Sequence, residues 1–443
     1  MSAPSIQAPA VVEVFSGILT VGALEQQLSA AKFANEGDII FDLDQVMFLE
    51  TTTLVLFLAL IVKYENQGRR LLFNLPEHKD VRDFIRAWNF PEAAARASKY
   101  GSFVKLTTIA THKYFGENEI DGNTNAYLPA SPLRPSKFVQ HHSAYFYPFQ
   151  ILDREHTPFT DALAITECET WSGSHIQAVL KGLLPASPQH VPRDIVFEAM
   201  ANAVRHPGAT HIFAVSHLGR KRGLTVDKPS VTKTSNGAWQ EPAHVSLCWW
   251  DNGMSIVDTL REPLDAGKAV RVPGLQPTIE ISLRIFDVDG EQVGTRTLDE
   301  NTEILASDSR ELLLAAAMLP GVTRDPNARA AVPPAEPSVI DASGSDGRAT
   351  DRELTGAGCV TGLDENFVAE ADRGTHPGMG LHYLLRAAID SYGGAVSIRT
   401  KNLFLHIKAK RKKQPGKYTA KVVLYPEACS VPGNMVTVRI PCA

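Results

Sequence analysis

The sequence is poor in cysteine and lacks the spacings that cysteine pairs would form. Only five cysteines stand among 443 residues, an odd number, and none forms a C-x-x-C pair. A disulfide scaffold and a zinc ribbon are therefore excluded, and this usage fits a reducing compartment. The opening MSAPSIQAPA has no basic stretch followed by an apolar one. We therefore expect no signal peptide and a cytoplasmic protein.

A long apolar run and a surplus of positive charge are also missing. The most apolar stretch, TLVLFLALIV (residues 53–62), is flanked by Glu50 and Lys63. It is only half of the roughly 20 residues needed to span a bilayer, so we expect a buried helix and no membrane partner. With 44 Lys+Arg against 49 Asp+Glu, the net charge is −5. This balance argues against nucleic acid as a partner.

The usual phosphate-binding loops are absent as well. The sequence contains no G-x-x-x-x-G-K-[ST] motif and no G-x-G-x-x-G after a strand pattern. Enzymes that hold phosphates with these loops are therefore excluded, and any nucleotide site must use other residues.

The chain divides into three parts by pattern. Strand and helix patterns alternate over residues 1–110, which predicts an α/β domain with helices packed on a sheet. Residues 111–150 are rich in Gly, Asn, Pro and Ser and form a linker, where the pair His141-His142 lacks a second cluster that would make a metal site. Residues 151–443 form a larger α+β part, with insertions expected at about 219–242 and 261–375. The second insertion contains a hairpin turn at Asp289-Gly290.

A first motif with chemical potential is EAMANAVRH, which has helical spacing and ends before Pro207-Gly208. Glu198 and Asn202 are four residues apart and share one face of this helix. The Asn202 oxygen can bind Mg²⁺, and Glu198 can take a proton from an attacking hydroxyl. The alternative is an ordinary solvated helix face.

Two further motifs follow along the chain. The apolar strand pattern VSLCWW ends in Asp251-Asn252-Gly253, where a buried carboxylate can accept a hydrogen bond from an amine such as that of adenine. The same three residues also suit a plain turn. Gly378-Met379-Gly380 opens a helix pattern, and such glycines expose backbone N–H groups to an anion. A simple loop before a helix is the alternative there.

Together and in this order, the motifs resemble those of the Bergerat-fold (GHKL) ATPases, which include gyrase, Hsp90, histidine kinases and anti-sigma-factor kinases. EAMANAVRH resembles the N-box, DNGMS and GMGL the two glycine boxes, and PGNMVTVRIP the last strand. The resemblance implies helices on a mixed, mostly antiparallel sheet, with residues 261–375 as a long inserted ATP lid. It also implies ATP and Mg²⁺ as cofactors, with these roles: Glu198 as general base, Asn202 for Mg²⁺, Asp251 for adenine, and Gly253, Gly378, Gly380 and Leu381 for the nucleotide.

Two features depart from the family pattern. Ser255 stands where the second glycine of the first box is usual, and the lid range is far longer than in histidine or anti-sigma kinases. A helical phosphoacceptor histidine is not evident, so the resemblance does not imply a sensor histidine kinase.

The N-terminal part resembles the STAS fold of anti-sigma-factor antagonists. The run from Ile39 to Phe73 follows that family's order of strand, short loop, helix, glycine and strand. Glu50-Thr51-Thr52-Thr53-Leu54 occupies the place of its phosphorylated loop, so the resemblance implies Thr52 as the phosphoacceptor. The alternative is that Thr51 caps the helix. The resemblance also implies a protein partner for this domain.

Three functions remain open on these grounds. The first is slow Mg²⁺-dependent ATP hydrolysis coupled to lid closure and partner regulation. The second is Ser/Thr kinase activity of the anti-sigma type on a STAS domain, and the third is a non-hydrolysing, ATP-gated interaction module. The sequence leaves homodimer formation open. A basic run around Pro415-Gly416 is expected to be a solvated hairpin (Lys408, Lys410, Arg411, Lys412, Lys413 and Lys417).

Overall fold

The protein is of the mixed α/β class, built on two sheets. The computed structural model describes residues 11–30, 37–78, 81, 82, 84, 85, 88, 90–98, 106, 107, 146–153, 199, 202, 203, 206–220, 243–270, 279–324, 380–411 and 414–441. The first sheet has four strands in the order β1-β2-β3-β4. The second has nine, in the order β5-β6-β7-β13-β10-β11-β12-β8-β9.

The N-terminal unit alternates strands and helices, as its sequence pattern predicts. Its strands all pair in parallel. Parallel neighbours need a crossover connection, and helices supply it here. The elements in chain order are β1 (Val11–Leu19), α1 (Val21–Ala30), β2 (Ile39–Leu49), α2 (Thr51–Asn66), β3 (Leu71–Asn74), α4 (Phe90–Ala97) and β4 (Leu106–Thr107).

Helix α2 contains the apolar run of residues 53–62 and is buried along that whole run, which confirms the expectation of a buried helix. On one side, Phe57 packs against the aromatic rings of Phe41, Phe73 and Phe90. On the other side, α2 packs on strands of the nine-stranded sheet. The helix ends before Gly68, which adopts a left-handed conformation with φ +74°. None of the described helices combines the length and apolar character needed to cross a membrane.

The nine-stranded sheet is mixed and mostly antiparallel. Each neighbouring pair is antiparallel except β12 and β8, which run in parallel. The strands are β5 (Phe146–Asp153), β6 (His211–Arg220), β7 (Ala243–Asp251), β8 (Glu280–Phe286), β9 (Gln292–Leu298), β10 (Ala395–Lys401), β11 (Leu403–Ala409), β12 (Lys417–Leu424) and β13 (Val431–Pro441).

Both faces of this sheet are buried around β7. Leu247 and Trp249 belong to one core, and the alternate residues Cys248 and Trp250 belong to the other. Because successive side chains of a strand point to opposite faces, burial on both faces demands the continuous apolar run seen in the sequence. The first core includes helices α10 (Ile256–Asp265), α11 (Arg310–Ala316), α14 (Gly380–Arg386) and the π-helical turn η3 (Ala387–Ser391).

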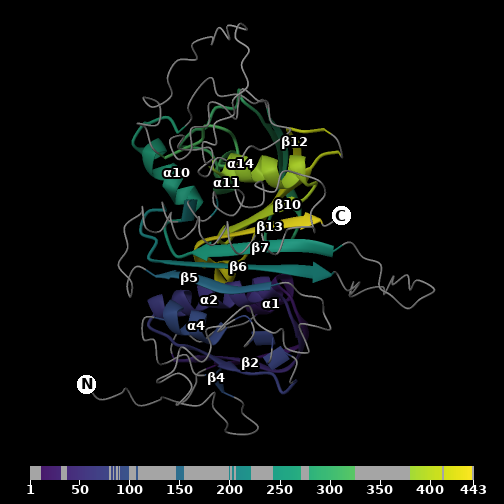
Figure 1. Ribbon diagram of the computed structural model, residues 1–443. Coiled ribbons are helices and arrows are strands. Elements are labelled where there is room, and N and C mark those ends of the chain that lie inside the picture. Colours follow the sequence, from purple (N-terminus) through teal and green to yellow (C-terminus); the bar gives the residue numbers. More distant parts are fainter. Residues whose placement is uncertain are drawn as a thin grey trace, which may run out of the picture.

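The second core joins the nine-stranded sheet to the N-terminal unit. The layers therefore run from helices α10, α11 and α14, through the large sheet, to helices α1, α2 and α4, and end at the small sheet (Figure 1). We call the side of the large sheet that carries α10, α11 and α14 its helix face, and the opposite side its docking face.

The described residues of the range expected to be an inserted lid, 261–270 and 279–324, contribute to the folded core. Strands β8 and β9 extend the large sheet, and residues 312–319 of the segment that begins with α11 are buried in the first core. The predicted hairpin is confirmed, with Gly290 at φ +81° in its turn. Strands β11 and β12, which contain Lys408 and Lys417 of the basic run, pair antiparallel, which confirms the second predicted hairpin. His141-His142 and residues 221–242, 271–278 and 325–375 lie outside the described residues.

Candidate functional site

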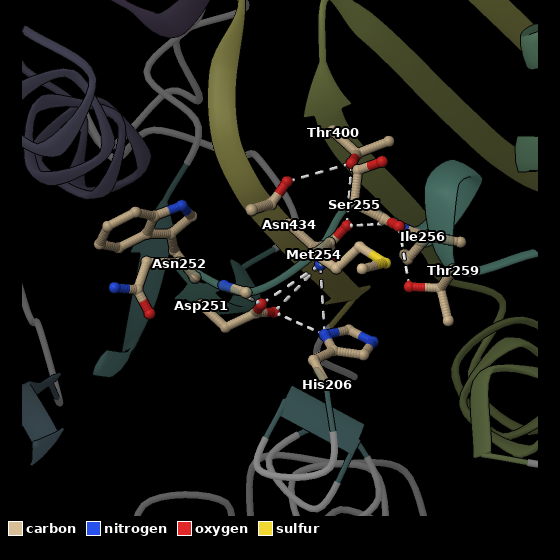
Figure 2. Close-up of polar contacts among 12 residues, drawn as sticks. His206, Asp251, Asn252, Met254, Ser255, Ile256, Thr259, Thr400 and Asn434 are labelled. Atoms are coloured by element: carbon tan, nitrogen blue, oxygen red, sulfur yellow. Dashed lines mark hydrogen bonds and ion pairs between the residues drawn. The ribbon is translucent and has the colours of Figure 1, made fainter. Parts of the chain in front are cut away.

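Asp251 ends strand β7 and is the centre of a buried hydrogen-bond network. Its side chain is almost fully buried, with the residue 1% exposed. Oδ2 lies 2.9 Å from Nδ1 of His206, and Oδ1 accepts hydrogen bonds from the backbone N–H of Gly253 at 3.0 Å and from Nδ2 of Asn434 at 3.2 Å. Figure 2 shows the side chains of His206 and Asn434 converging on this carboxylate.

His206 follows the helical residues Ala199, Asn202 and Ala203 and lies just after them. Pro207-Gly208 ends the helix, with Gly208 at φ +73°. The carbonyl of Pro207 accepts a hydrogen bond of 2.8 Å from the N–H of Met254, which ties this end to the loop after β7. Burial by itself lowers the pKa of His206, but the charge and hydrogen bond of Asp251 outweigh it and raise that pKa above its usual value.

Asn434 comes from the last strand, β13, and stands directly opposite Asp251 in the sheet register. It is fully buried, and every described hydrogen bond of its side chain is internal. Nδ2 also donates to the carbonyl of Met254 at 2.9 Å, while Oδ1 accepts from the N–H of Ile256 at 2.7 Å and from the hydroxyl of Thr400 at 2.9 Å. Asn434 therefore connects Asp251, the loop after β7, and β10.

The loop Asp251-Asn252-Gly253 is anchored as the turn interpretation predicts. Oδ1 of Asn252 accepts the backbone N–H groups of Thr210 and His211, both at 2.9 Å, which fastens the loop to the start of β6. The 3.0 Å bond from Gly253 to Asp251 is an Asx turn. The functional and the turn interpretations are thus compatible, because the turn itself positions the carboxylate.

Ser255, which departs from the family pattern, has a structural role. Its hydroxyl accepts a hydrogen bond of 3.0 Å from the N–H of Asp258 and so caps the N-terminus of α10. Serine is among the best residues for this position, whereas glycine lacks the capping oxygen. Because α10 begins directly after the loop, a capping serine at position 255 is favoured over the glycine of the family pattern.

Gly253 is required by packing within the protein. A Cβ at this position would lie 3.0 Å from Oδ1 of Asp251, 3.1 Å from Cβ of Ala209 and 3.1 Å from the carbonyl oxygen of Pro207. Because all three neighbours belong to the chain, a bound ligand is not needed to explain this glycine.

Asn202 lies one helical turn before His206, in the same helical segment as Ala199 and Ala203, which join the first core. Its Nδ2 is buried and has no hydrogen-bond partner among the described atoms. An unsatisfied buried amide is uncommon in proteins and suits a polar ligand. The part of the chain that the structure describes holds no group of three or more His, Cys, Asp or Glu side chains that could bind a metal.

Of the remaining expected site residues, the structure describes Gly380 and Leu381 only. Gly380 begins α14, and Leu381 packs partly buried against the first core. The helix that carries Asn202 and helix α14 thus pack on the helix face, to which Asp251 also points by alternation with Leu247 and Trp249. Glu198 and Gly378 lie outside the described residues.

Thr52 and the Asp251 network lie on opposite sides of the large sheet. Thr52 lies on α2, is 6% exposed, and its hydroxyl lies 3.4 Å from a carboxylate oxygen of Glu50. The N-cap residue of α2 is Glu50, and the hydroxyl of Thr51 has no hydrogen-bond partner among the described atoms. The interpretation of Thr51 as the helix cap is therefore wrong. Because α2 packs on the docking face, the large sheet separates it from Asp251.

Sequence reasoning missed His206 and Asn434. His206 is four residues after Asn202, a spacing that places both on one helix face, so helical periodicity could have found it. Asn434 could be found only by aligning Gly433-Asn434 with the end of β7, a pairing across 183 residues.

The carboxylate of Asp251 can accept a hydrogen bond from one more donor. A carboxylate offers about four acceptor positions, and three donors already use it. An amine that approaches from the helix face could take the fourth.

Comparisons with protein-family models, curated proteins and solved structures give no match for this chain.

Proposed function

We propose that the C-terminal unit is a Bergerat-type nucleotide-binding unit that binds Mg–ATP. The observation that carries this proposal is the meeting of Asp251, His206 and Asn434 at the end of β7, on the sheet face shared by the Asn202 helix and α14. In the Bergerat-fold ATPases that these motifs resemble, the N-box helix, the first glycine box and the last strand form one site. Here the three matching segments converge although they are far apart in the chain.

The residues present fit an amine-bearing ligand. Asp251 keeps one acceptor position, and the unpartnered amide of Asn202 lies on the helix one turn before His206. Asp251 would receive the amine of the base, Asn202 would hold Mg²⁺ through its oxygen, and the backbone at Gly378 and Gly380 would meet phosphate. Because Asp251 is 1% exposed, neighbouring groups have to move for a base to reach it, and we assign this movement to His206.

Slow hydrolysis is the activity we assign to this site. Mg–ATP, when bound, would supply a phosphoanhydride bond that water can hydrolyse and a metal ion that neutralises phosphate charge. Glu198 takes the proton of the attacking water, while Asp251 holds the base and takes no part in proton transfer. His206 shields Asp251 from water until a ligand displaces it.

A kinase that phosphorylates its own Thr52 is disfavoured by the layer order. Thr52 is buried between the two sheets and lies on the opposite side of the large sheet from Asp251. Self-phosphorylation would require the N-terminal unit to leave the docking face. The N-terminal unit, which we propose to be STAS-like, is instead suited to a regulatory role through this contact.

Incubation with γ-labelled ATP separates the three candidate functions. Free labelled phosphate supports hydrolysis, labelled protein supports kinase activity, and tight binding without either supports an ATP-gated interaction module. If the full-length protein does not bind ATP in the presence of Mg²⁺, the proposal is wrong.

Two variants separate binding from chemistry. Asp251→Asn should weaken ATP binding by roughly 5- to 150-fold, because a donor then faces the amine of the base. Glu198→Ala should preserve binding and lower turnover by about 10²–10⁴-fold. Asp289→Asn, in the exposed β8–β9 turn, is the matched control for the first change. Equal thermal stability of Asp251→Asn and Asp289→Asn is needed to assign an affinity loss to the site.

A further inference from the structure

Beyond the N-terminal unit, the docking face of the large sheet carries an array of cations that are exposed among the described residues. Alternation along the strands places Arg439 of β13, Lys408 of β11, Lys421 of β12 and Arg284 of β8 on this face, because their neighbours in each strand belong to the first core. All four residues are exposed. We call these four residues the basic face. They come from four strands spread over more than 150 positions of the sequence, and only Lys408 belongs to a local charge run.

The strand register brings these cations side by side. Lys421 pairs with Arg284 across β12–β8 and with His406 across β11–β12. Lys408 is two residues from His406 on the same strand, and Arg439 pairs with Ala395, which pairs with Lys408 in turn. Burial lowers the pKa of His406, and the charges of Lys408, Arg439 and Lys421 lower it further. The charges of three of the four cations therefore act on the imidazole of His406.

None of the four cations has an ion-pair partner among the described residues. The carboxylate of Glu280, which lies on the same strand as Arg284, pairs instead with Lys410 at 2.8 Å and Lys417 at 3.9 Å. Like charges placed directly opposite each other destabilise a sheet. A protein with a net charge of −5 that concentrates unpaired cations in this way implies an anionic ligand.

Hydroxyl and aromatic side chains accompany the basic face. Ser282, Thr419, Thr295 and Thr297 share the same cross-strand rows as the cations. Hydroxyls and cations together are the usual partners of phosphate oxygens. The next row holds Phe404 and Phe286, both only partly buried, with the ammonium of Lys421 4.3 Å from the Phe286 ring centre. Aromatic rings beside a basic row are typical of surfaces that stack unpaired bases.

From these placements we propose that the basic face binds single-stranded nucleic acid. The phosphates would follow the basic face from Arg284 and Lys421 in one cross-strand row to Lys408 and Arg439 in the adjacent row, and unpaired bases would lie over Phe404. Strands are spaced about 4.8 Å apart, so the basic face extends over roughly 20 Å from β8 to β13, which is enough for a few nucleotides. The overall negative charge does not oppose this assignment, because local fields at short range decide such contacts at physiological salt.

The aromatic row distinguishes this partner from other anions. An acidic peptide would use the cations but has no bases to stack on the partly buried rings beside them. A duplex would present its phosphates without unpaired bases to stack. The single strand therefore uses the largest number of the features found on this face.

Binding can be measured by fluorescence anisotropy with the full-length protein and a labelled oligo-dT of 20 nucleotides. Four phosphate contacts predict a slope of about −3 for log Kobs against log salt concentration. Lys421→Gln should reduce the size of this slope by about 0.7, and neutralising all four cations should weaken binding roughly tenfold or more. Phe404→Leu keeps an apolar side chain but removes the ring, and should weaken binding roughly 5- to 150-fold.

Lys268→Gln is the matched control, because Lys268 is an exposed cation that follows α10 on the other side of the sheet and has no described ion pair. It should leave affinity and slope unchanged. All variants are first compared with the native protein by urea denaturation. Since the four cations are exposed and repel one another, their neutralisation should not destabilise the fold.

Three outcomes would overturn the proposal. The first is no binding of oligo-dT at low salt. The second is equal weakening by Lys268→Gln and Lys421→Gln, which would indicate a nonspecific charge effect. The third is equal competition by polyglutamate or by a duplex of matched length, which would replace the single strand by an acidic peptide or a backbone-only ligand. ATP binding is measured in parallel on the same variants. Its persistence when oligo-dT binding fails would leave the nucleotide site intact and reject only this proposal.

Discussion

His206 and Asp251 form a close pair, with Nδ1 and Oδ2 2.9 Å apart, where the end of a helix meets the end of a strand. The imidazolium form of His206 is stabilised by this contact, which raises its pKa above 6.5. A raised folded-state pKa contributes stability that is fully present below the unfolded-state pKa. That contribution is lost as pH rises through the folded-state pKa.

We therefore expect His206→Gln to destabilise the protein most below pH 6.5, with a deficit that shrinks as pH rises. The free energy of unfolding by urea, measured from pH 5.5 to 9, tests this. His406→Gln is a control of opposite sign, because the pKa of His406 is lowered. Its neutral form favours folding, so the contribution of His406 is lost as pH falls below 6.5. A His206→Gln deficit that is independent of pH would contradict the assigned charge state.

Asn434 should be among the least replaceable polar residues of the large sheet. Asn434→Ala removes one of the three donors to the carboxylate of Asp251 and leaves the N–H of Ile256 and the carbonyl of Met254 without their buried side-chain partner. Each orphaned group typically costs about 1–3 kcal/mol, so we expect a loss of on the order of 3 kcal/mol in unfolding free energy. Thr437→Val, three residues along β13, removes only a 3.3 Å contact to the sulfur of Cys248. It should cost less than about 1 kcal/mol. Equal losses for the two variants would show that the Asn434 network is not important for stability.

The local elements of the fold were largely predictable, since their signals lie within short windows. The apolar run before Gly68 predicts α2, and Asp289-Gly290 predicts the β8–β9 turn; both predictions are confirmed. The place of β8 and β9 in the large sheet was not predictable, because β8 pairs with β12, which comes more than 130 residues later. Nothing in either segment alone specifies that pairing.

The candidate site was predictable only in part for the same reason. Asp251 follows an apolar strand, which is visible in the sequence, but its partner Asn434 joins it only through the register of β7 and β13. The docking face was not foreseen, because burial of Trp250 and Cys248 against α2 requires the tertiary contact between the two units. The basic face is hidden in the sequence by the distance between its strands.

Gly433 should be far less tolerant of substitution than Gly68, although both have left-handed backbones with φ +70° and +74°. A Cβ on Gly433 would lie 1.7 Å from the carbonyl oxygen of Asp251, whereas a Cβ on Gly68 meets nothing within 4 Å. Gly68→Ala should cost about 1–2 kcal/mol through backbone strain alone. Gly433→Ala adds a backbone clash worth a further 1–3 kcal/mol or so, and should displace Asp251. Urea denaturation and ATP binding of both variants check this, and equal unfolding free energies would contradict the close approach of β13 to Asp251.

The buried ion pair between Glu25 of α1 and Arg399 of β10 joins the N-terminal unit to the large sheet. Their side chains are 3% and 2% exposed, and Arg399 also donates to the carbonyl of Cys429 at 2.6 Å and lies over the ring of Tyr425. Removing one partner of a buried pair typically costs about 3–5 kcal/mol, because the other charge is left unpaired. Arg399→Met should therefore destabilise the protein by about that amount.

The double variant Glu25→Leu with Arg399→Met decides whether the ions or their packing stabilise this contact. Apolar replacements of similar volume often restore stability at buried pairs, so the double variant should be more stable than Arg399→Met. Burial raises the pKa of Glu25 even with Arg399 beside it, and without that arginine the carboxyl should bind a proton more readily still. A raised carboxyl pKa favours folding at low pH and loses that contribution as pH rises, so Arg399→Met should be less stable at pH 8 than at pH 5. Urea denaturation of the two single variants and the double variant at both pH values measures the coupling. Additive losses that do not depend on pH would mean that Glu25 and Arg399 do not interact across the contact between the two units.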